Sequence, residues 1–360
     1  MKVAFFIPSL SNKGGLERST VSLLNTLSDS FQDSIQVFLI CFQNEPPAFA
    51  LSTNVKVLFL NITNYKKQYL KLIYNLRKNI ESNNIDIVVS VEIMSLLFTY
   101  PATISLKNRP KTVVWEHFNF KNNNNRRLRD WLRVLASKNL DLIITLTERD
   151  ANTWRKELNP KAKITYIYNI SPFDGHTPSY QIESKKAIAI GRYAPVKGFD
   201  RLIKAWELYE KKFGSNGWTL DIIGYGEQSE QLQSLIDSTG LNTINLVPAI
   251  KEMEYYYSNA GLYCMSSYFE GLSMVMIEAQ SYAVPSVAFD IYTGNSEILA
   301  PGSGILVKDG DLDAYATAIS KLTSNDDLRL TMSNLAEKNS SRFGANDIAK
   351  RWLKELHDIQ

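Results

Sequence analysis

Two glutamates, Glu270 and Glu278, stand eight positions apart in the stretch SSYFEGLSMVMIEAQSYAVPSVAFD. Gly271 follows the first, and SMVMIEAQSYA then reads as a buried helix, which places Glu270 on the preceding loop and Glu278 inside the helix. Carboxylates are rarely left without partners among apolar residues, because burying a charge is costly. The two glutamates can therefore grip two separate parts of one ligand. The alternative for Glu278 is an ion pair with a nearby Lys or Arg.

The segment GRYAPVKGFDRLIKAW carries two cations next to a helix start. Arg192 stands at the end of a predicted strand, and Lys197 lies in the following loop, just before Gly198 and a helix. Fixed positive charges and the unpaired backbone N–H groups of a helix N-terminus both favour an anion. The segment therefore predicts a diphosphate site, and a turn with two solvated basic residues is the alternative.

Two glycine pairs fall in loops that follow predicted strands. Gly14 and Gly15 precede a helix, where the lack of side chains lets backbone N–H groups approach a phosphate, although a simple turn is the better explanation of this pair taken alone. Gly224 and Gly226 begin like a dinucleotide fingerprint, but Ser229 occupies the third glycine position. We therefore do not expect NAD as a cofactor.

His117 follows a predicted strand in WEHFNF and falls on the same predicted rim as the first glycine pair, which makes it a candidate for the reacting centre. A lone histidine is more often structural, and that is the alternative. Cys41 and Cys264 lie in apolar runs and read as core residues, while Asp309 to Asp311 read as a helix cap. We therefore expect no bound metal.

The elements that must position these residues alternate between strand and helix along the whole chain. This alternation predicts two doubly wound, Rossmann-like α/β domains with parallel sheets that face each other across a cleft. We place the first domain at residues 1–170 and the second at residues 171–344. A last helix at about 345–360 can pack on either domain, and its return to the first would explain why the chain continues.

Charge is distributed unevenly along the 360 residues, although 44% hydrophobic and 21% charged content is ordinary for a globular enzyme. Residues 1–170 carry 23 Lys+Arg against 13 Asp+Glu, whereas residues 171–360 carry 17 against 24. A basic first domain suits an anionic surface or substrate, such as phospholipid head groups or a lipid pyrophosphate. Nucleic acid is the competing polyanion.

A basic amphipathic helix follows an asparagine run in FKNNNNRRLRDWLRVLASKNL. Arg126, Arg127 and Arg129 accompany Trp131, and they can present a positive face with an aromatic residue to anionic lipid, with a solvated helix face as the alternative. No segment approaches the roughly 18 apolar residues of a membrane span. We expect a cytoplasmic protein that can lie peripherally on the inner face of the cytoplasmic membrane.

Taken together these motifs resemble the family 4 retaining glycosyltransferases, whose architecture is the two-lobed GT-B fold. The resemblance covers nearly the whole chain, and the spacing of Glu270 and Glu278 is its most diagnostic part. It is carried by Gly14, Gly15, Glu17, Arg18, His117, Asn169, GRYAPVKG, GYGE and the glutamate pair. Two departures fall in the second domain: Ala283 stands where the family usually has glycine before the proline, and IYTGNSEIL is a loose version of its glycine-and-glutamate loop.

The resemblance implies a role for each matching residue. Arg192 and Lys197 would hold the donor diphosphate, Glu270 a hydroxyl of the donor sugar, and Glu278 the ribose. His117 would lie close to the transferred sugar and the acceptor. The remaining donor-binding residues would be Gly14, Gly15, Gly224, Gly226, Gly271, Leu272 and Ser273. Independently of the resemblance, we place Arg18, Arg126, Arg127, Arg129 and Trp131 on the acceptor or membrane side.

The resemblance also implies the reaction. We expect a metal-independent retaining transfer of a sugar from a nucleotide sugar, most simply a UDP-sugar, to a glycan acceptor. That acceptor would be a lipid-linked intermediate of capsule, O-antigen or lipopolysaccharide synthesis, and we expect no nucleic acid partner. The alternatives are a sugar-nucleotide epimerase or phosphorylase of the same architecture, and a non-enzymatic protein that binds nucleotide sugars or nucleic acid.

Overall fold

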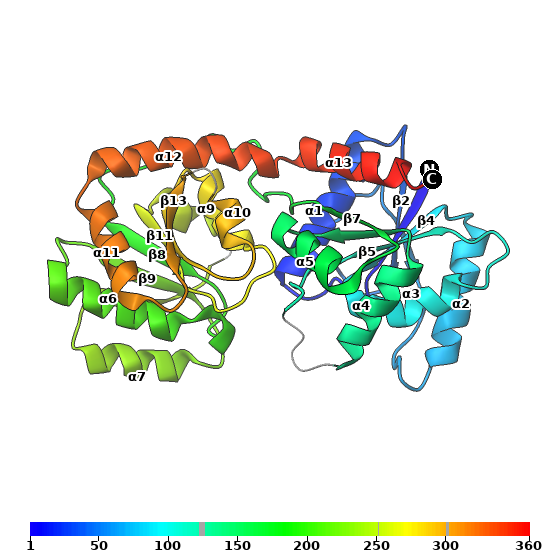
Figure 1. The fold of residues 1–360 in the computed structure, drawn as a ribbon, viewed down its shortest axis with the longest axis horizontal. Coiled ribbons are helices and arrows are strands. Elements are labelled where there is room, and N and C mark those ends of the chain that lie inside the picture. The colour runs from blue at the N-terminus through cyan, green and yellow to red at the C-terminus, as the bar shows by residue number, and fades with distance from the viewer. Residues whose placement is uncertain (122–126, 251, 300–301) are drawn as a thin grey trace. The chain divides into compact units, whose positions relative to one another are not determined.

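The computed structural model describes residues 1–121, 127–250, 252–299 and 302–360 (Figure 1). They divide into two compact units, Met1–Pro172 with Ala345–Gln360, and Phe173–Gly344. The boundary between the units falls two residues after the one drawn from the sequence. The last helix, α13 (Ala345–His357), belongs to the first unit.

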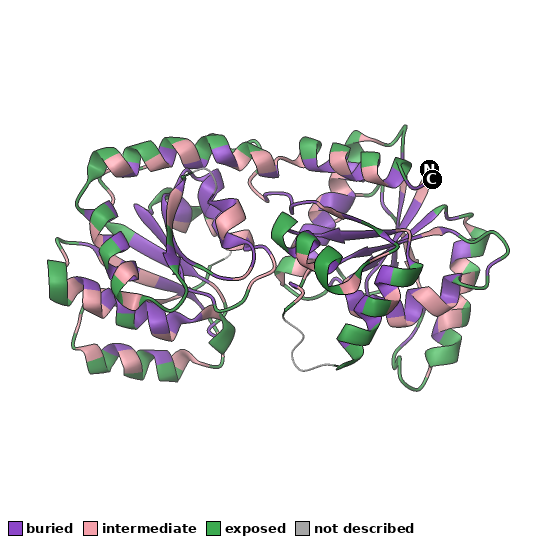
Figure 2. Cartoon of the chain, viewed as in Figure 1, coloured by how far each residue is buried: buried purple, intermediate pink, exposed green. Residues whose placement is uncertain are grey.

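Within the described residues the first unit is built on a parallel seven-stranded sheet in the order β3-β2-β1-β4-β5-β6-β7. The interior strands are buried on both faces, as is usual for parallel sheets covered by helices, and Figure 2 shows them in the buried colour. The strands are β1 (Lys2–Phe6), β2 (Gln36–Cys41), β3 (Lys56–Phe59), β4 (Ile87–Val91), β5 (Lys111–Trp115), β6 (Leu142–Thr145) and β7 (Lys163–Tyr166).

Helices cover both faces of this sheet. The strand order reverses between β3 and β4, so right-handed crossovers place α1 on one face and α2 to α5 on the other. The helix α13 packs against α1, and α2 packs against α3 (Figure 1). The helices are α1 (Gly15–Ser30), α2 (Tyr69–Ser82), the 3-10 turn η1 (Ile93–Ser95), α3 (Leu96–Thr103), α4 (Arg127–Asn139) and α5 (Glu148–Leu158).

The helix α2 begins at Tyr69, after a short polar turn. The side chain of Asn64 accepts hydrogen bonds from the backbone N–H groups of Lys66 and Lys67, both at 3.1 Å. Such local side-chain bonds offer the backbone an alternative to the helix, so a turn occupies the residues before α2.

The second unit holds a six-stranded parallel sheet in the order β10-β9-β8-β11-β12-β13, as described within residues 173–344 outside the gaps. Its strands are β8 (Lys186–Ile190), β9 (Thr219–Gly224), β10 (Ile244–Pro248), β11 (Leu262–Met265), β12 (Ser286–Asp290) and β13 (Gly304–Lys308). Its helices are η2 (Pro195–Lys197), α6 (Phe199–Phe213), α7 (Ser229–Thr239), α8 (Glu254–Ser258), α9 (Met274–Ser281), α10 (Asn295–Ile298), α11 (Leu312–Thr323), α12 (Asp326–Ser340) and η3 (Ser341–Phe343).

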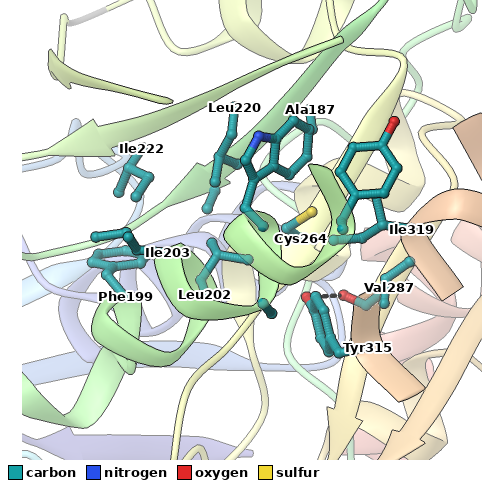
Figure 3. Packing of buried hydrophobic residues seen from close by; sticks show 14 of the residues in the cluster. Ala187, Phe199, Leu202, Ile203, Leu220, Ile222, Cys264, Val287, Tyr315 and Ile319 are labelled. Atoms are coloured by element: carbon teal, nitrogen blue, oxygen red, sulfur yellow. Dashed lines mark hydrogen bonds between the residues drawn. The ribbon is translucent and has the colours of Figure 1, made fainter. Parts of the chain in front are cut away.

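The core of the second unit joins α6 and α11 to this sheet. Leu202, Leu220 and Cys264 are buried in one cluster, shown in Figure 3. The hydroxyl of Tyr315 on α11 donates a hydrogen bond to the carbonyl oxygen of Val287 on β12 at 2.8 Å. This bond satisfies a polar group deep inside the core. None of the described helices is both long and apolar enough to cross a bilayer.

Ala283 adopts a left-handed backbone conformation that glycine usually occupies. It follows α9 with a φ of 56°, in the left-handed region, and its N–H donates to the carbonyl oxygen of Gln280 at 2.9 Å. Glycine reaches this conformation without steric cost and is common after helix C-termini. The alanine therefore occupies a backbone position for which glycine is better suited.

We expect Ala283→Gly to leave the second unit as stable as before, or up to about 1 kcal/mol more stable. Relief of the left-handed strain contributes about 1–2 kcal/mol, and the added freedom of the unfolded chain offsets about 0.4–1 kcal/mol. Urea unfolding measures the difference. The control is Ala279→Gly inside α9, which is fully buried and should lose about 1 kcal/mol or more. Equal losses in both variants would contradict the strain at Ala283.

Candidate active site

The candidate donor residues of the second unit gather at the carboxyl edge of its sheet. β8 leads into η2 and α6, and β11 leads into a loop and α9. β8 and β11 are neighbours in the sheet, so the loops that follow them leave the same edge side by side. These loops carry both cations and both glutamates of the sequence motifs.

Lys197 and Glu270 form an ion pair in this structure. The Lys197 Nζ atom lies 2.8 Å from Glu270 Oε1, and the two side chains are 22% and 14% exposed. The hydroxyl of Thr293 donates to the backbone carbonyl oxygen of Glu270 at 2.7 Å, which fixes the loop that carries the carboxylate. The sequence predicted a ligand role for each residue, and the structure adds that the two charges compensate each other.

Glu278 lies inside α9 and is buried, with 3% of its surface exposed. The hydroxyl of Tyr257 donates to Glu278 Oε2 at 2.6 Å, and the Tyr257 ring stacks on Tyr282 at a centroid distance of 5.5 Å. The predicted placement of one glutamate on the loop and one in the helix is confirmed. A tyrosine hydroxyl therefore holds this carboxylate at a fixed place within the second unit.

The N-terminus of α9 is formed by the residues between the glutamates. Leu272 and Ser273 are buried, and Gly271 is half-buried. Ser273 is the N-cap residue with an extended backbone, and its carbonyl oxygen accepts the N–H of Ile277 at 3.1 Å. The first N–H groups of such a helix lack intrahelical partners and can face an anion.

Arg192 is exposed two residues beyond β8, and among the described residues its side chain forms no hydrogen bond or ion pair. Gly224 and Gly226, at the end of β9, pack on the backbone of the same loop, because a side chain at either glycine would collide with carbonyl oxygens of Gly191 or Tyr193. The two glycines therefore support the loop that presents Arg192. Nothing in this packing gives them a ligand contact of their own.

Arg201, which the sequence motifs did not single out, links the two site loops. Its Nε donates to the carbonyl oxygen of Ser266 at 2.6 Å and its Nη2 to that of Ser267 at 2.5 Å. Its Nη1 lies 2.7 Å from an oxygen of Asp309, and its guanidinium lies 4.1 Å from the ring centroids of both Tyr268 and Phe289. The sequence signal for Arg201 is a lone arginine on the otherwise apolar face of a predicted helix.

Gly198 makes this approach of the two loops possible. Its φ of 61° lies in the left-handed region, and a Cβ there would collide with the carbonyl oxygen of Ser266. The hydroxyl of Ser266 donates to the carbonyl oxygen of Lys197 at 3.0 Å. Gly198 and Arg201 therefore position Lys197 and Glu270 relative to each other, without being placed in the ligand site themselves.

The glycine pair of the first unit stands at the start of α1. Gly14 is the N-cap residue, and Gly15, the first helical residue, is exposed. A Cβ at Gly14 would lie 2.5 Å from Glu17 Oε2. Arg18 is half-buried, with its guanidinium 5.9 Å from the ring of Phe49. The backbone N–H groups of this helix start are open to a ligand.

Arg129 does not lie on a lipid-facing surface, so this part of the sequence prediction is wrong. It is 4% exposed, with Nη1 2.5 Å from Glu92 Oε1 and 3.6 Å from Glu116 Oε1. The two glutamates follow β4 and β5, and their buried carboxylates require a cation nearby. Arg127 and Trp131 are exposed as expected, and Arg126 lies outside the described residues.

Glu116 is buried and His117 is half-buried where the chain leaves β5. Desolvation, together with the charge of Glu92, raises the pKa of Glu116 to about 8. Burial lowers the pKa of His117 to about 3, and its ring lies 4.2 Å from that of Trp115. The His117 Nε2 atom is buried and has no hydrogen-bond partner among the described residues. The Nε2 atom of a neutral imidazole can donate a hydrogen bond to a ligand hydroxyl or accept one from it.

A pocket of about 260 Å³ opens in the first unit where β1 and β4 end. Its lining includes the polar residues Ser9, Asn12, Glu17, Glu92 and Ser95, and apolar residues such as Leu16 and Phe98. The backbone of Glu92 has a φ of 72°, and its Oε2 atom accepts a hydrogen bond from the backbone N–H of Met94 at 3.1 Å. The mixture of carboxylates and apolar side chains suits a hydroxyl-bearing ring.

Comparison with known proteins places each half of the chain in a family. Residues 13–170 match the family described as glycosyltransferase family 4, and residues 178–339 match glycosyl transferases group 1. The chain belongs to glycosyltransferase family 4. The alternatives of an epimerase, a phosphorylase and a non-enzymatic binding protein are set aside by this finding.

Several relatives of this glycosyltransferase align over their full length. An uncharacterised glycosyltransferase of Haemophilus influenzae is 28% identical over 98% of each chain. The amylovoran biosynthesis glycosyltransferase of Erwinia amylovora is 26% identical over 98% of each. An N-acetylgalactosaminyltransferase of Campylobacter jejuni, named for a glycan acceptor on PP-undecaprenol, is 24% identical over 100% of this chain and 99% of the relative.

Solved structures confirm the GT-B fold of the glycosyltransferase. Anabaena HepE in complex with UDP-glucose gives a TM-score of 0.78 at 18% identity, over 99% of this chain and 100% of that one. Staphylococcus aureus TarM, in a complex that includes UDP, gives 0.79 at 16% identity over 99% of each chain. The prediction of two Rossmann-like domains is therefore confirmed.

The described residues of the glycosyltransferase contain no group of three or more His, Cys, Asp or Glu side chains placed to hold a metal ion. Arg192 and Lys197 lie in the loop that follows β8, and Lys197 pairs with Glu270 in the loop before α9. Independence from metal stays a prediction.

Glu116→Gln should reduce the loss of stability that the glycosyltransferase undergoes as pH rises. The pKa of Glu116 is about 8 in the folded protein against 4.5 ordinarily, so its protonated form contributes stability that is present below pH 4.5 and lost as pH rises through about 8. Glutamine stays neutral throughout. Thermal unfolding between pH 6 and pH 9 measures the effect, with the exposed Glu157→Gln as control. Parallel pH curves for wild type and Glu116→Gln would contradict the buried, protonated carboxyl.

Proposed function

We propose that the glycosyltransferase transfers a sugar from a UDP-sugar to a lipid-linked glycan, with retention of anomeric configuration and without a metal ion. The observation that carries the proposal is the cluster in the second unit. There Lys197 is paired with Glu270, Arg192 is exposed on the loop that carries Lys197, and Glu278 is buried in α9 with its carboxylate bound by Tyr257.

The cations would act on the leaving group. Cleavage of a glycosyl–diphosphate bond develops negative charge on the departing phosphate, and Arg192, Lys197 and the N-terminus of α9 can stabilise that charge. Removal of one such preorganised donor typically costs about 2.7–4 kcal/mol of barrier. Two cations and a helix N-terminus supply the stabilisation that a metal ion provides in other enzymes.

The two glutamates would hold the donor by its two ends. Glu270 can accept a hydrogen bond from a sugar hydroxyl while it keeps Lys197 in place. Glu278, fixed by Tyr257, can accept from the ribose hydroxyls. A nucleotide sugar carries hydroxyl donors on its sugar and on its ribose, at the two ends of a central diphosphate.

The first unit would supply the acceptor side. His117 is neutral at physiological pH, so it can contact a sugar hydroxyl without adding charge. The backbone of Gly14 and Gly15 would face the diphosphate. Retention would follow from attack on the face that the donor phosphate leaves, with that phosphate taking the acceptor proton.

The kind of acceptor is supported by the names of two relatives. The Campylobacter jejuni relative acts on a glycan carried by PP-undecaprenol, and the Erwinia amylovora relative belongs to amylovoran biosynthesis. A lipid-linked intermediate of a surface polysaccharide is therefore the acceptor that we propose. The basic composition of residues 1–170 agrees with an acceptor that bears a diphosphate.

A panel of UDP- and GDP-sugars tests the donor. At about 100 times its dissociation constant, a bound donor should stabilise the protein by about 2.7 kcal/mol in thermal unfolding. We expect a UDP-sugar to do so and GDP-sugars not to. Lys197→Ala should lose this stabilisation, together with at least about 100-fold in transfer of labelled sugar to a lipid extract, because the diphosphate loses a cation.

The control for this panel is Lys204→Ala, which removes an exposed lysine of α6, the helix that follows Lys197. It should bind the donor and turn over like wild type. Stabilisation by GDP-sugars alone would overturn the UDP assignment. Near-normal transfer by Lys197→Ala would overturn the diphosphate site.

Arg201→Lys should weaken UDP binding about tenfold, because a single ammonium cannot replace the fork that reaches Ser266, Ser267 and Asp309. Titration calorimetry with UDP measures the change. Arg329→Lys is the matched control. Arg329 is also a buried arginine that donates to two carbonyl oxygens, of Leu322 and Ile182, and it lies 5.0 Å from the ring of Trp218.

Both arginine variants should lose stability, because each leaves buried carbonyl oxygens without donors. Only Arg201→Lys should change the affinity for UDP. Equal UDP affinities in the two variants would show that Arg201 serves stability alone and does not position the donor loops.

A further inference from the structure

The exposed large apolar side chains of the first unit are confined to one of its faces. They lie on α2 and the turn before it, at the end of α3, and on the segment from the end of β5 through α4, and the described parts of α1, α5 and α13 carry none. They are Tyr65, Tyr69, Leu70, Tyr74, Ile104, Phe118, Leu128, Trp131 and Val134. We call the surface of α2, α3 and α4 the α2–α4 face; these helices cover the same face of the sheet (Figure 1).

The outward side of α2 carries the most exposed apolar side chain of this face, Leu70. Leu70 is 82% exposed and Tyr74, one turn later, is 65% exposed. Lys71 and Lys78 share that outward stripe by their helical spacing, while Leu72 and Leu76 point inward and are fully buried. A leucine left almost wholly in water on a helix that already has a buried stripe indicates a second contact surface.

The same region is strongly basic. Residues 46–80 contain no Asp or Glu and six basic residues, Lys56, Lys66, Lys67, Lys71, Arg77 and Lys78. Arg77 donates to Ser105 Oγ at 2.6 Å, which holds the end of α3, with exposed Ile104 and Lys107, beside α2. The exposed acidic residues of the described helices on this face are Glu81, in the last turn of α2, and Asp130 on α4, which pairs with Arg133.

We propose that the α2–α4 face docks on an anionic lipid bilayer, with Leu70, Tyr74 and Trp131 at the level of the head groups and the lysines against the phosphates. Tyrosine and tryptophan favour the membrane–water interface, and lysines with long stems keep their charge in water beside buried apolar groups. Anionic lipid supplies the complementary charge. The sequence placed this surface around Arg127 and Trp131, and the structure extends it to α2.

Single-stranded nucleic acid is a poorer fit to this face. Such ligands are held by stacking on planar aromatic side chains and arginines. Arg77, Arg129 and Arg133 are instead engaged within the protein, and Leu70 and Val134 offer no surface for stacking. The cations left on α2 are lysines, which suit a diffuse layer of phosphates.

Flotation of the full chain with vesicles tests this surface, and it requires neither donor nor acceptor. Vesicles of phosphatidylcholine with 30% phosphatidylglycerol should bind the wild type, and vesicles of phosphatidylcholine alone should bind much less. Binding should fall at 0.5 M salt, because exposed charges are screened. The double variant Leu70→Glu/Tyr74→Glu should partition more than about tenfold less, since two apolar contacts become charges.

The control is Leu330→Glu, at an exposed leucine of α12 in the second unit, which should bind vesicles like the wild type. The double variant should keep the UDP affinity of the wild type, so a failure of the proposed reaction is separable from a failure of docking. The proposal would be overturned if the wild type bound vesicles with and without phosphatidylglycerol equally. It would also be overturned if the double variant bound the anionic vesicles as well as the wild type does. Binding of single-stranded RNA that competes with the vesicles and is lost in the same variant would overturn it as well.

Discussion

The carboxyl edge of the second sheet depends on one buried guanidinium, that of Arg201. It donates to the carbonyl oxygens of Ser266 and Ser267, pairs with Asp309, and lies between two aromatic rings. Without it, two buried carbonyl oxygens would lose their donors, which costs about 1–3 kcal/mol for each. The loop so fixed continues to Glu270, whose carboxylate pairs with Lys197 from the other loop. The positions of Lys197 and Glu270 relative to each other therefore depend on the buried Arg201.

The first unit uses a buried arginine in a comparable way. Arg129 is placed between Glu92 and Glu116, which follow adjacent strands. Two carboxylates this close and this poorly hydrated could not both stay ionised without a cation, and the pKa of Glu116 is raised even with one. The arginine is therefore held inside the protein, and it orders the polar groups next to His117. Its side chain is unavailable to any external surface.

Three arginines of α2 and α4 are engaged within the first unit, whereas Arg127 and the lysines of α2 are exposed. The planar, forked guanidinium groups of Arg77, Arg129 and Arg133 satisfy several acceptors at once within the fold. The lysines of α2 remain in solvent, next to apolar side chains that the fold leaves uncovered. Net charge alone, which is basic over residues 1–170, does not separate these two uses. This family 4 glycosyltransferase carries a paired lysine and glutamate at the carboxyl edge of the sheet in one unit, and a basic surface with exposed apolar side chains on the other.

The sequence by itself determined the two parallel-sheet domains, the loop position of Glu270 and the helical position of Glu278. These follow from local patterns: apolar runs, glycine punctuation and helix periodicity are set by neighbours within a few residues. The sequence did not determine that Arg129 is buried, that Tyr257 holds Glu278, or that Arg201 joins two loops. Each of these contacts joins segments that lie far apart in the chain, such as Arg201 and Ser267. Which distant groups meet depends on strand order and on the packing of helices against the sheet, and those are decided only in the tertiary structure.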